Sequence, residues 1–334
     1  SAQEVSRTGG TVAGLDNGNF VVVIHDKTGY SDPAGNVTTF AIVTPSGSIV
    51  KTNTLVDPRD IWDNVAAYKG GFVVRCHDTL YFYNNAGDLQ GSTPQASSGL
   101  TFGTGRNDAS RVASDIRSYY VYLAGRTPEV SENNPGEAVW VAIWDSRTRA
   151  FVTAAQVSDG SPANERNNRV NLAVDALDRF CVAYANKADI VNFPTASWQV
   201  AARVMAFDGA KITYLTHSFY PFVNSDPTGV ATVLTEKPSV AMTTSKICIA
   251  ANGIVNNLNH PADGGNTAAQ TTFYTVISHP APVSSTPPTI TATKSGNNLI
   301  LSWAASAGSF TLQSSAVVTG GWANVVPQPP IVPV

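Results

Sequence analysis

A short block recurs five times along the chain. Each copy starts with a Val-Ala or Leu-Ala pair, and an aromatic or aliphatic residue seven or eight positions later opens a short apolar run. A self-similar unit with variable spacing indicates one supersecondary element whose loops differ in length. The pairs are Val12-Ala13, Val65-Ala66, Val112-Ala113, Leu172-Ala173 and Val240-Ala241.

Each block continues with further strand-like runs, about four in each repeat. The segments 139–144 and 199–207 alternate or run apolar and end at turn residues, and no long stretch has a helical apolar period. Four-stranded units repeated around an axis form a β-propeller. The sequence therefore predicts an all-β protein with a five-bladed β-propeller over residues 1–283.

The ends of the predicted ring provide a way to close it. The fifth repeat has no fourth strand-like run before the Pro-rich stretch, whereas residues 3–7 precede the first inner strand and have no other partner in the first repeat. We expect this N-terminal segment to supply the outer strand of blade five, because that pairing removes an open sheet edge.

A second region follows a stiff linker at residues 284–288. Three strand-like runs are expected at 289–294, 298–303 and 309–314. The segments 298–303, 310–315 and 320–322 resemble a small immunoglobulin- or fibronectin-type module, which implies a β-sandwich that is incomplete here. Residues 289–334 are thus expected to form a partial β module with a Pro-rich tail. We expect residues 286–334 to pack on the propeller or to mediate self-association, with Ile331 and Val332 buried.

The composition excludes several classes of protein. The residues are 43% hydrophobic and 13% charged, and the net charge is -3 without a basic patch, so no nucleic-acid partner is expected. No apolar run approaches the roughly 18 residues of a membrane span. Cys76, Cys181 and Cys248 fall on predicted second strands as buried thiols, without the spacing of a disulfide framework or metal site. No cofactor is expected, and metal binding stays open.

The repeats also carry a resemblance. The segments 10–23 and 170–184, the latter followed by 200–209, resemble the repeats of large secreted bacterial β-propeller proteins. The resemblance implies a secreted propeller and indicates no activity. A chain that starts at Ser1-Ala2 agrees with removal of a signal peptide, so an extracellular or cell-surface location is expected.

Four long insertions are expected on one face of the ring, because the turn between strands two and three lies beside the connection between blades. They are 26–36, 126–137, 186–197 and 252–270. His25-Asp26 and His77-Asp78 start this turn in two repeats and could bind a metal or a sugar hydroxyl. Capping of strand ends is the more ordinary use. Trp62 and Trp198 could stack on a sugar ring or pack against a loop.

Carboxylates precede several inner strands on the same face. Asp63, Asp108 and Glu236 belong to repeats two, three and five, and five-bladed glycosidases place three carboxylates at comparable points because acid and base must flank one glycosidic bond. The first repeat lacks such an acid, so a structural or solvated role competes with catalysis. Motifs such as GxSxG and HExxH are absent from the sequence.

These features lead to two hypotheses about function. The main one is a non-catalytic secreted protein that binds a glycan or another surface component, or forms part of an extracellular assembly. The alternative is a polysaccharide-active glycoside hydrolase or lyase with its site in the propeller funnel. Convergence of the three carboxylates would favour the alternative, and an extensive contact through residues 286–334 would favour assembly.

Overall fold

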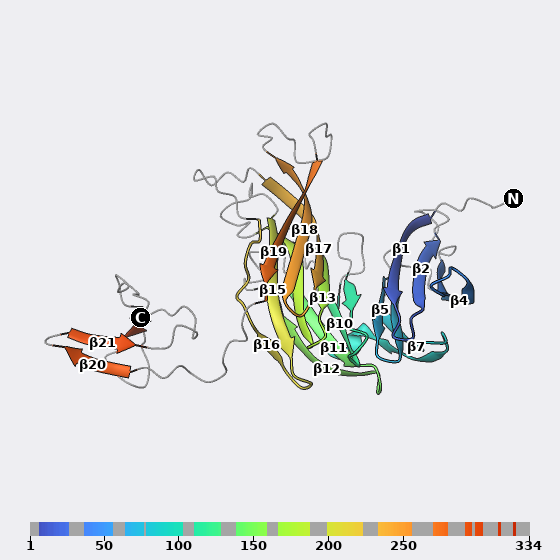
Figure 1. Ribbon diagram of the computed structural model, residues 1–334, viewed down its shortest axis with the longest axis horizontal. Helices are drawn as coiled ribbons and strands as arrows, with labels where there is room; N and C mark the ends of the chain where they lie inside the picture. Colours follow the sequence, from blue (N-terminus) through green and yellow to red (C-terminus); the bar gives the residue numbers. More distant parts are fainter. Residues whose placement is uncertain are drawn as a thin grey trace. The chain divides into compact units, whose positions relative to one another are not determined.

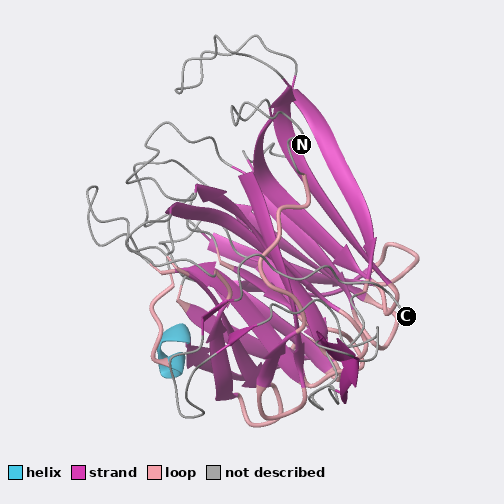
Figure 2. Ribbon diagram, turned by 90° about the vertical axis from the view of Figure 1, so that its left-hand side faces the viewer, coloured by secondary structure: helices cyan, strands magenta, loops and turns pink. Residues whose placement is uncertain are grey.

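The computed structural model describes residues 7–26, 37–55, 64–76, 78–102, 110–127, 138–158, 166–187, 199–222, 233–255, 270–279, 291–295, 298–302, 313–314 and 323–324. The chain divides into two compact units, Ser1–His279 and Pro280–Val334. Strands make up nearly all of the described structure (Figure 2), and one short 3-10 helix, η2 (Gln95–Ser98), follows β8. No helix within the described ranges is long and apolar enough to span a membrane.

Within the described residues, the first unit contains five antiparallel sheets, each a simple meander. Sheet 1 holds β1 (Arg7–Gly14), β2 (Phe20–Asp26), β3 (Val37–Val43) and β4 (Ile49–Leu55). Sheet 2 holds β5 (Asn64–Tyr68), β6 (Gly71–Cys76), β7 (Thr79–Asn84) and β8 (Leu89–Pro94). Sheet 3 holds β9 (Arg111–Ala113), β10 (Tyr120–Arg126), β11 (Val139–Asp145) and β12 (Ala150–Gln156). Sheet 4 holds β13 (Arg166–Val174), β14 (Arg179–Lys187), β15 (Gln199–Phe207) and β16 (Ile212–Tyr214), and sheet 5 holds β17 (Val233–Met242), β18 (Lys246–Val255) and β19 (Gln270–Ser278).

The sheets pack face to face, which explains why their strands are apolar on both faces. In β11, Val141 and Ile143 belong to the apolar cluster shared with sheet 4, whereas Ala142 and Trp144 belong to the cluster shared with sheet 2. Successive side chains of a strand point to opposite faces, so a sheet between two neighbours needs apolar residues at consecutive positions. The result is a near-continuous run such as Val-Trp-Val-Ala-Ile-Trp.

The first strands of the sheets adjoin one another in chain order. β1 contacts β5, β5 contacts β9, β9 contacts β13, and β13 contacts β17. Figure 1 shows the sheets of this unit following one another from β1 in blue to β19 in orange. The prediction of an all-β protein built from four-stranded units is confirmed for sheets 1 to 4.

The closed five-bladed ring is not confirmed. Sheet 5 has three strands within the described residues, and residues 1–6 lie outside them. Arg7, which was expected at the edge of sheet 5, belongs to β1 instead. It pairs with Asp26 of β2, because the hydrogen-bonded ladder of the first hairpin continues to that residue. Closure by the N-terminal segment therefore stays a prediction.

The described residues of the second unit form two short pairs of strands. β20 (Thr291–Ser295) pairs with β21 (Asn298–Ser302), close to the first two runs expected from the sequence. β22 (Gln313–Ser314) and β23 (Ala323–Asn324) pair over two residues each. The immunoglobulin-like sandwich is not confirmed by these strands. The linker at 284–288 and the Pro-rich tail with Ile331 and Val332 lie outside the described residues, so self-association through 286–334 also stays a prediction.

Candidate functional site

The direction of the strands gives each sheet two chemically distinct ends. The first strands start where the second strands finish, as the cross-strand partners Arg7 and Asp26 in sheet 1 and Glu236 and Asn252 in sheet 5 show. We call this the entry end, because the chain enters each sheet there. The opposite end, where strands one and two are joined by a turn, is the turn end. The segments that follow β2, β10, β14 and β18, which contain the four predicted insertions, leave the sheets at the entry end and then lie outside the described residues.

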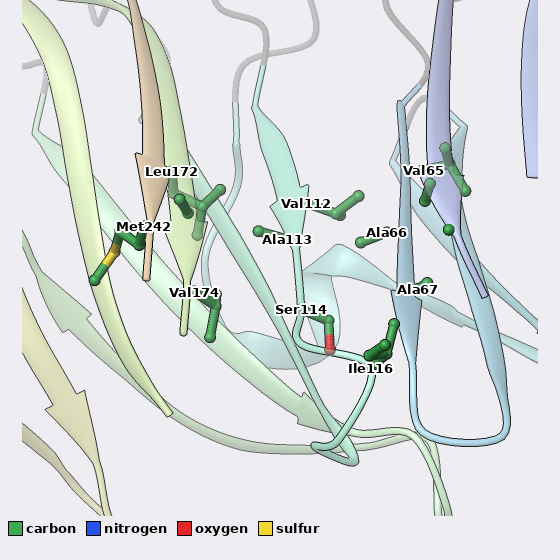
Figure 3. A pocket seen from close by; sticks show the side chains of 13 residues that line it. Val65, Ala66, Ala67, Val112, Ala113, Ser114, Ile116, Leu172, Val174 and Met242 are labelled. Carbon is green, nitrogen blue, oxygen red and sulfur yellow. The ribbon is translucent and has the colours of Figure 1, made fainter. Parts of the chain in front are cut away.

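A cavity of about 340 Å³ is lined mainly by the first strands of all five sheets. Its lining is small and apolar (Figure 3), with Val65 from β5, Val112 from β9, Leu172 from β13 and Met242 from β17 among the labelled side chains. The remaining lining residues are Ala13, Gly14, Ala66, Ala67, Ala113, Ser114, Ile116, Ala173 and Val174. None of these side chains can bind a metal strongly or transfer a proton at neutral pH. The lining of this cavity therefore offers no group for metal binding or proton transfer.

Asn64, the first residue of β5, braces the entry end between sheets 2 and 3. Its side chain is buried, donates a hydrogen bond to the carbonyl oxygen of Ser110 at 3.0 Å and accepts one from the backbone N–H of Val112 at 2.8 Å. These bonds fix the first residue of β5 against the first residues of β9. The starts of the two strands are therefore held together at this point.

Two arginines are buried near the ends of second strands, at the entry end. Arg75 is the penultimate residue of β6 and is fully buried, and Arg126 is the last residue of β10 and is 8% exposed. A guanidinium withdrawn from water is stable only beside acceptors, so these residues indicate acceptor groups at the entry end. Sequence reasoning did not single them out. The sequence does contain a signal for them, because each arginine lies at or next to the end of an apolar run that forms a second strand.

Three of the first strands are irregular close to the entry end. The pairing register shifts between Arg7 and Gly9 in β1, between Asn168 and Asn171 in β13, and between Glu236 and Ser239 in β17. In β13 the shift includes Arg169 in a left-handed conformation with φ of 50°. Such bulges redirect side chains and are common beside active sites. Glu236, one of the predicted acids, lies immediately before the bulge of β17.

The two predicted His-Asp pairs have different surroundings. His25 and Asp26 end β2, opposite Gly9 and Arg7 of β1. Asp78 lies instead in the tight connection between Cys76 of β6 and Thr79 of β7. Its carboxylate accepts a hydrogen bond from Thr79 Oγ1 at 3.0 Å, and its carbonyl accepts one from the N–H of Gln95 at 2.7 Å. These two hydrogen bonds stabilise the connection between β6 and β7.

Five of the nine predicted site residues lie outside the described residues. They are Trp62, Asp63, His77, Asp108 and Trp198. Convergence of Asp63, Asp108 and Glu236 therefore stays a prediction. Within the described ranges no group of three His, Cys, Asp or Glu residues could hold a metal ion. The three cysteines lie on the second strands β6, β14 and β18 as expected, and burial raises the pKa of Cys181 to about 12.

Three acids at the turn end are bonded to arginines of their own turns. Asp115, Asp145 and Asp175 follow this pattern: each receives two or more hydrogen bonds from an arginine of its own turn, namely Arg117, Arg147 and Arg179. Side-chain hydrogen bonds from Arg147 hold the pKa of Asp145 below its usual value. Carboxylates bonded in this way stabilise the turns. Their oxygens are occupied by the arginines, so we do not assign them a catalytic role.

His279 adds a buried imidazole to the turn end. It is the last residue of the first unit, and its Nε2 lies 3.4 Å from Oδ2 of Asp175. Burial and the nearby Arg179 guanidinium lower its pKa from the ordinary 6.5, whereas Asp175 opposes the change. A neutral imidazole is therefore favoured where sheets 4 and 5 meet.

No protein-family model matches the sequence, and no curated protein sequence matches it either. Solved structures with a similar course of the chain are known at low identity. An alpha-L-arabinanase from Penicillium chrysogenum in complex with arabinobiose is 8% identical with a TM-score of 0.43, over 76% of this chain and 78% of the arabinanase. A polysaccharide lyase of family PL25, an ulvan lyase, is 9% identical with a TM-score of 0.44, over 74% of this chain and 65% of the lyase. The β-propeller domain of the trilobed protease from Pyrococcus furiosus is 7% identical with a TM-score of 0.41, over 91% of this chain and 78% of that domain.

These neighbours correct the main functional hypothesis. Most of them are glycoside hydrolases or polysaccharide lyases, which contradicts the prediction of a non-catalytic binding or structural protein and agrees better with its alternative. Sequence identities of 7–9% and TM-scores below 0.5 indicate only a similar course of the chain. Any assignment of chemistry has to come from the residues of this protein.

Proposed function

We propose that the chain is a secreted enzyme that cleaves a polysaccharide, as a glycoside hydrolase or a lyase, at the entry end of a five-bladed propeller. The observation that carries this proposal is the central cavity. The first strands of all five sheets line it, so we propose that the residues that lead into those strands gather around one axis. Secretion is supported by the resemblance of the repeats to those of secreted bacterial propeller proteins.

The proposed acids lead into three of these strands. Asp63 precedes Asn64 directly, Asp108 lies two residues before Ser110, and Glu236 lies in β17. The hydrogen bonds of Asn64 to Ser110 and Val112 hold the entrances of β5 and β9 together, which favours a short distance between the first two acids. Hydrolysis of a glycosidic bond needs two carboxyl groups about 5–9.5 Å apart, one of them protonated.

The buried arginines suit the electrostatic requirements of such a pair. A carboxylate beside a guanidinium keeps its charge, because the ion pair lowers its pKa, and can act as nucleophile or base. A carboxyl group farther from the arginines and shielded from water retains its proton and can act as acid. Arg75 and Arg126 are therefore assigned as positioning residues that would keep one acid ionised.

The remaining predicted residues are assigned to substrate binding. His25, Asp26, His77 and Asp78 would bind sugar hydroxyls, and the indoles of Trp62 and Trp198 would stack on sugar rings. In a lyase, a histidine among them would accept the proton next to the uronate carboxyl group. The product then distinguishes the two chemistries, because a lyase leaves an unsaturated sugar and a hydrolase does not.

The test is an activity screen with matched variants. Arabinan, arabinoxylan, pectin, alginate and ulvan are incubated with the full chain, and reducing ends and the ultraviolet absorbance of unsaturated uronides are measured. We expect one of these polysaccharides to be cleaved. At least two of Asp63→Asn, Asp108→Asn and Glu236→Gln should lower kcat by about 100-fold or more.

The control is Asp145→Asn, which removes a carboxylate at the turn end that is bonded to Arg147. It should leave kcat unchanged, although it lowers stability. Wild-type protein that cleaves none of these substrates, or three acid variants with full activity, would contradict the proposed function.

A further inference from the structure

Four apolar clusters join the five sheets. Each cluster combines residues of two consecutive sheets, from sheets 1 and 2 to sheets 4 and 5. The second strands of neighbouring sheets meet in every cluster, as Cys181 of β14 and Ile249 of β18 do. A closed ring of five sheets has five such interfaces. Within the part of the chain that the structure describes, the fifth interface, between sheet 5 and sheet 1, is missing.

The face of sheet 1 that points away from sheet 2 is apolar and exposed. Val12, in the recurring block, is 65% exposed, whereas the equivalent Val65, Val112 and Leu172 are 8%, 7% and 6% exposed. Phe20 is 41% exposed, whereas the equivalent Phe72 and Phe180 are fully buried. The exposed residues are of the types that the later repeats bury against the preceding sheet.

Sheet 5 has a matching face on the side away from sheet 4. Tyr274 and Val276 of β19 are 74% and 54% exposed, although third-strand residues that face the next sheet, such as Ile42 and Val204, are fully buried. Cys248 lies on this face, opposite Val276 in the pairing, and is only partly buried. Its equivalent Cys181 is fully buried against sheet 5.

We infer that sheet 5 packs on sheet 1 through these two faces and thereby closes the ring within one chain. Large exposed apolar patches on a folded protein indicate a contact surface. The occupant follows from the repeat, because β1 and β17 already line the same cavity and each face carries the residues that the other four interfaces bury. By this equivalence Cys248 and Ala250 meet Phe20 and Val22.

Closure has a consequence for the entry end. It brings the start of β17, which contains Glu236, beside the end of β2, which contains His25 and Asp26. The packing itself does not depend on the chain being an enzyme. Only this consequence rests on the proposed function, because it would complete the site from the first and last sheets.

The test introduces a disulfide across the inferred interface. Val22→Cys should form an intramolecular disulfide with native Cys248 under mild oxidation, as read by peptide mass spectrometry and by the number of free thiols. Cys76 and Cys181 are fully buried and do not compete. Thr52→Cys is the control, because Thr52 lies in the same row as Val22 but two strands farther out. The added distance of about 10 Å exceeds the reach of a disulfide.

Each outcome decides the inference without any measurement of activity. Efficient intramolecular crosslinking of Val22→Cys together with little crosslinking of Thr52→Cys supports closure. A disulfide between two chains assigns the face to a second copy and overturns it, as does crosslinking of Val22→Cys no better than the control. If the variant does not fold, Cys248 of the wild type is labelled with a thiol reagent. Closure predicts labelling at least about 100-fold slower than in the unfolded chain, and labelling at the unfolded rate would overturn it.

Discussion

The two ends of the sheets use polar residues differently. At the turn end, Asp115, Asp145 and Asp175 each bind an arginine two or four residues later in the same turn. At the entry end, the buried Asn64 binds the backbone of the neighbouring sheet, and Arg75 and Arg126 are buried near the ends of β6 and β10. None of Asp63, Asp108 and Glu236 has a Lys or Arg two or four residues later. These acids of the turn end are thus bonded within their own turns, whereas the three acids predicted for the entry end have no lysine or arginine at these spacings in the sequence.

The largest effect on stability is expected from the most buried acid of the turn end. The Asp175 side chain is fully buried and accepts hydrogen bonds from Nε and Nη2 of Arg179 at 2.9 and 2.6 Å. Asp175→Asn keeps the shape but leaves the guanidinium without its counter-charge, which should cost about 3 kcal/mol of unfolding free energy. Calorimetry should show a melting temperature lower by about 5–10 °C.

Asp145→Asn is the matched control for that variant. Asp145 makes the same type of pair with Arg147, but the arginine side chain is 53% exposed, so the cost should be about 1 kcal/mol or less. Equal losses of unfolding free energy for the two variants would contradict the claim that burial makes the Asp175–Arg179 pair the stronger of the two.

A smaller loss is expected from Asn64→Ala at the entry end. The substitution leaves the Ser110 carbonyl and the Val112 N–H without their buried partner, which should cost about 2 kcal/mol. Amide exchange of Val112 should accelerate, because its hydrogen bond is lost. Asn17→Ala, in an exposed turn, serves as the control and should change stability by no more than about 0.5 kcal/mol. An unchanged amide exchange rate at Val112 would contradict the claim that Asn64 holds sheets 2 and 3 together.

The smallest effect concerns pH and His279. Because its folded-state pKa is lowered from 6.5, the unfolded chain binds the proton more readily. His279 therefore favours the folded state above its unfolded pKa, and this stability is lost as the pH falls from 6.5 through the lower folded value. His279→Gln should reduce the fall in melting temperature between about pH 7.5 and about pH 5. His217→Gln replaces an exposed histidine and serves as the control. Identical profiles of melting temperature against pH for the wild type and both variants would contradict a buried, neutral imidazole at His279.

The repeated apolar runs made the architecture predictable. Blocks such as Phe72-Val73-Val74 predicted second strands, and alternation in 139–144 and 199–207 predicted third strands, all of which the structure contains. The different positions of the two His-Asp pairs were not predictable. His25 and Asp26 are the last two residues of β2, whereas Asp78 lies in the short connection between β6 and β7, because the lengths of the connections differ while the dipeptide is the same.

Long-range polar contacts were also beyond sequence reasoning. The bonds of Asn64 to Ser110 and Val112 cross 46 and 48 residues, and no local pattern indicates them. Arg7 joined β1 rather than sheet 5, since a ladder with β2 was available nearby in the chain. The carboxylates were selected by residue type and position, and their distances depend on how the five sheets meet.

The most direct test of the proposed site is an experimental distance between carboxyl groups. A crystal structure of the full chain should place at least two of Asp63, Asp108 and Glu236 about 5–10 Å apart at the entry end of the central cavity, open to solvent. That spacing would allow one acid and one base to flank a glycosidic bond. Three carboxyl groups more than about 15 Å from one another, or each bonded to an arginine of its own sheet as at the turn end, would contradict the account.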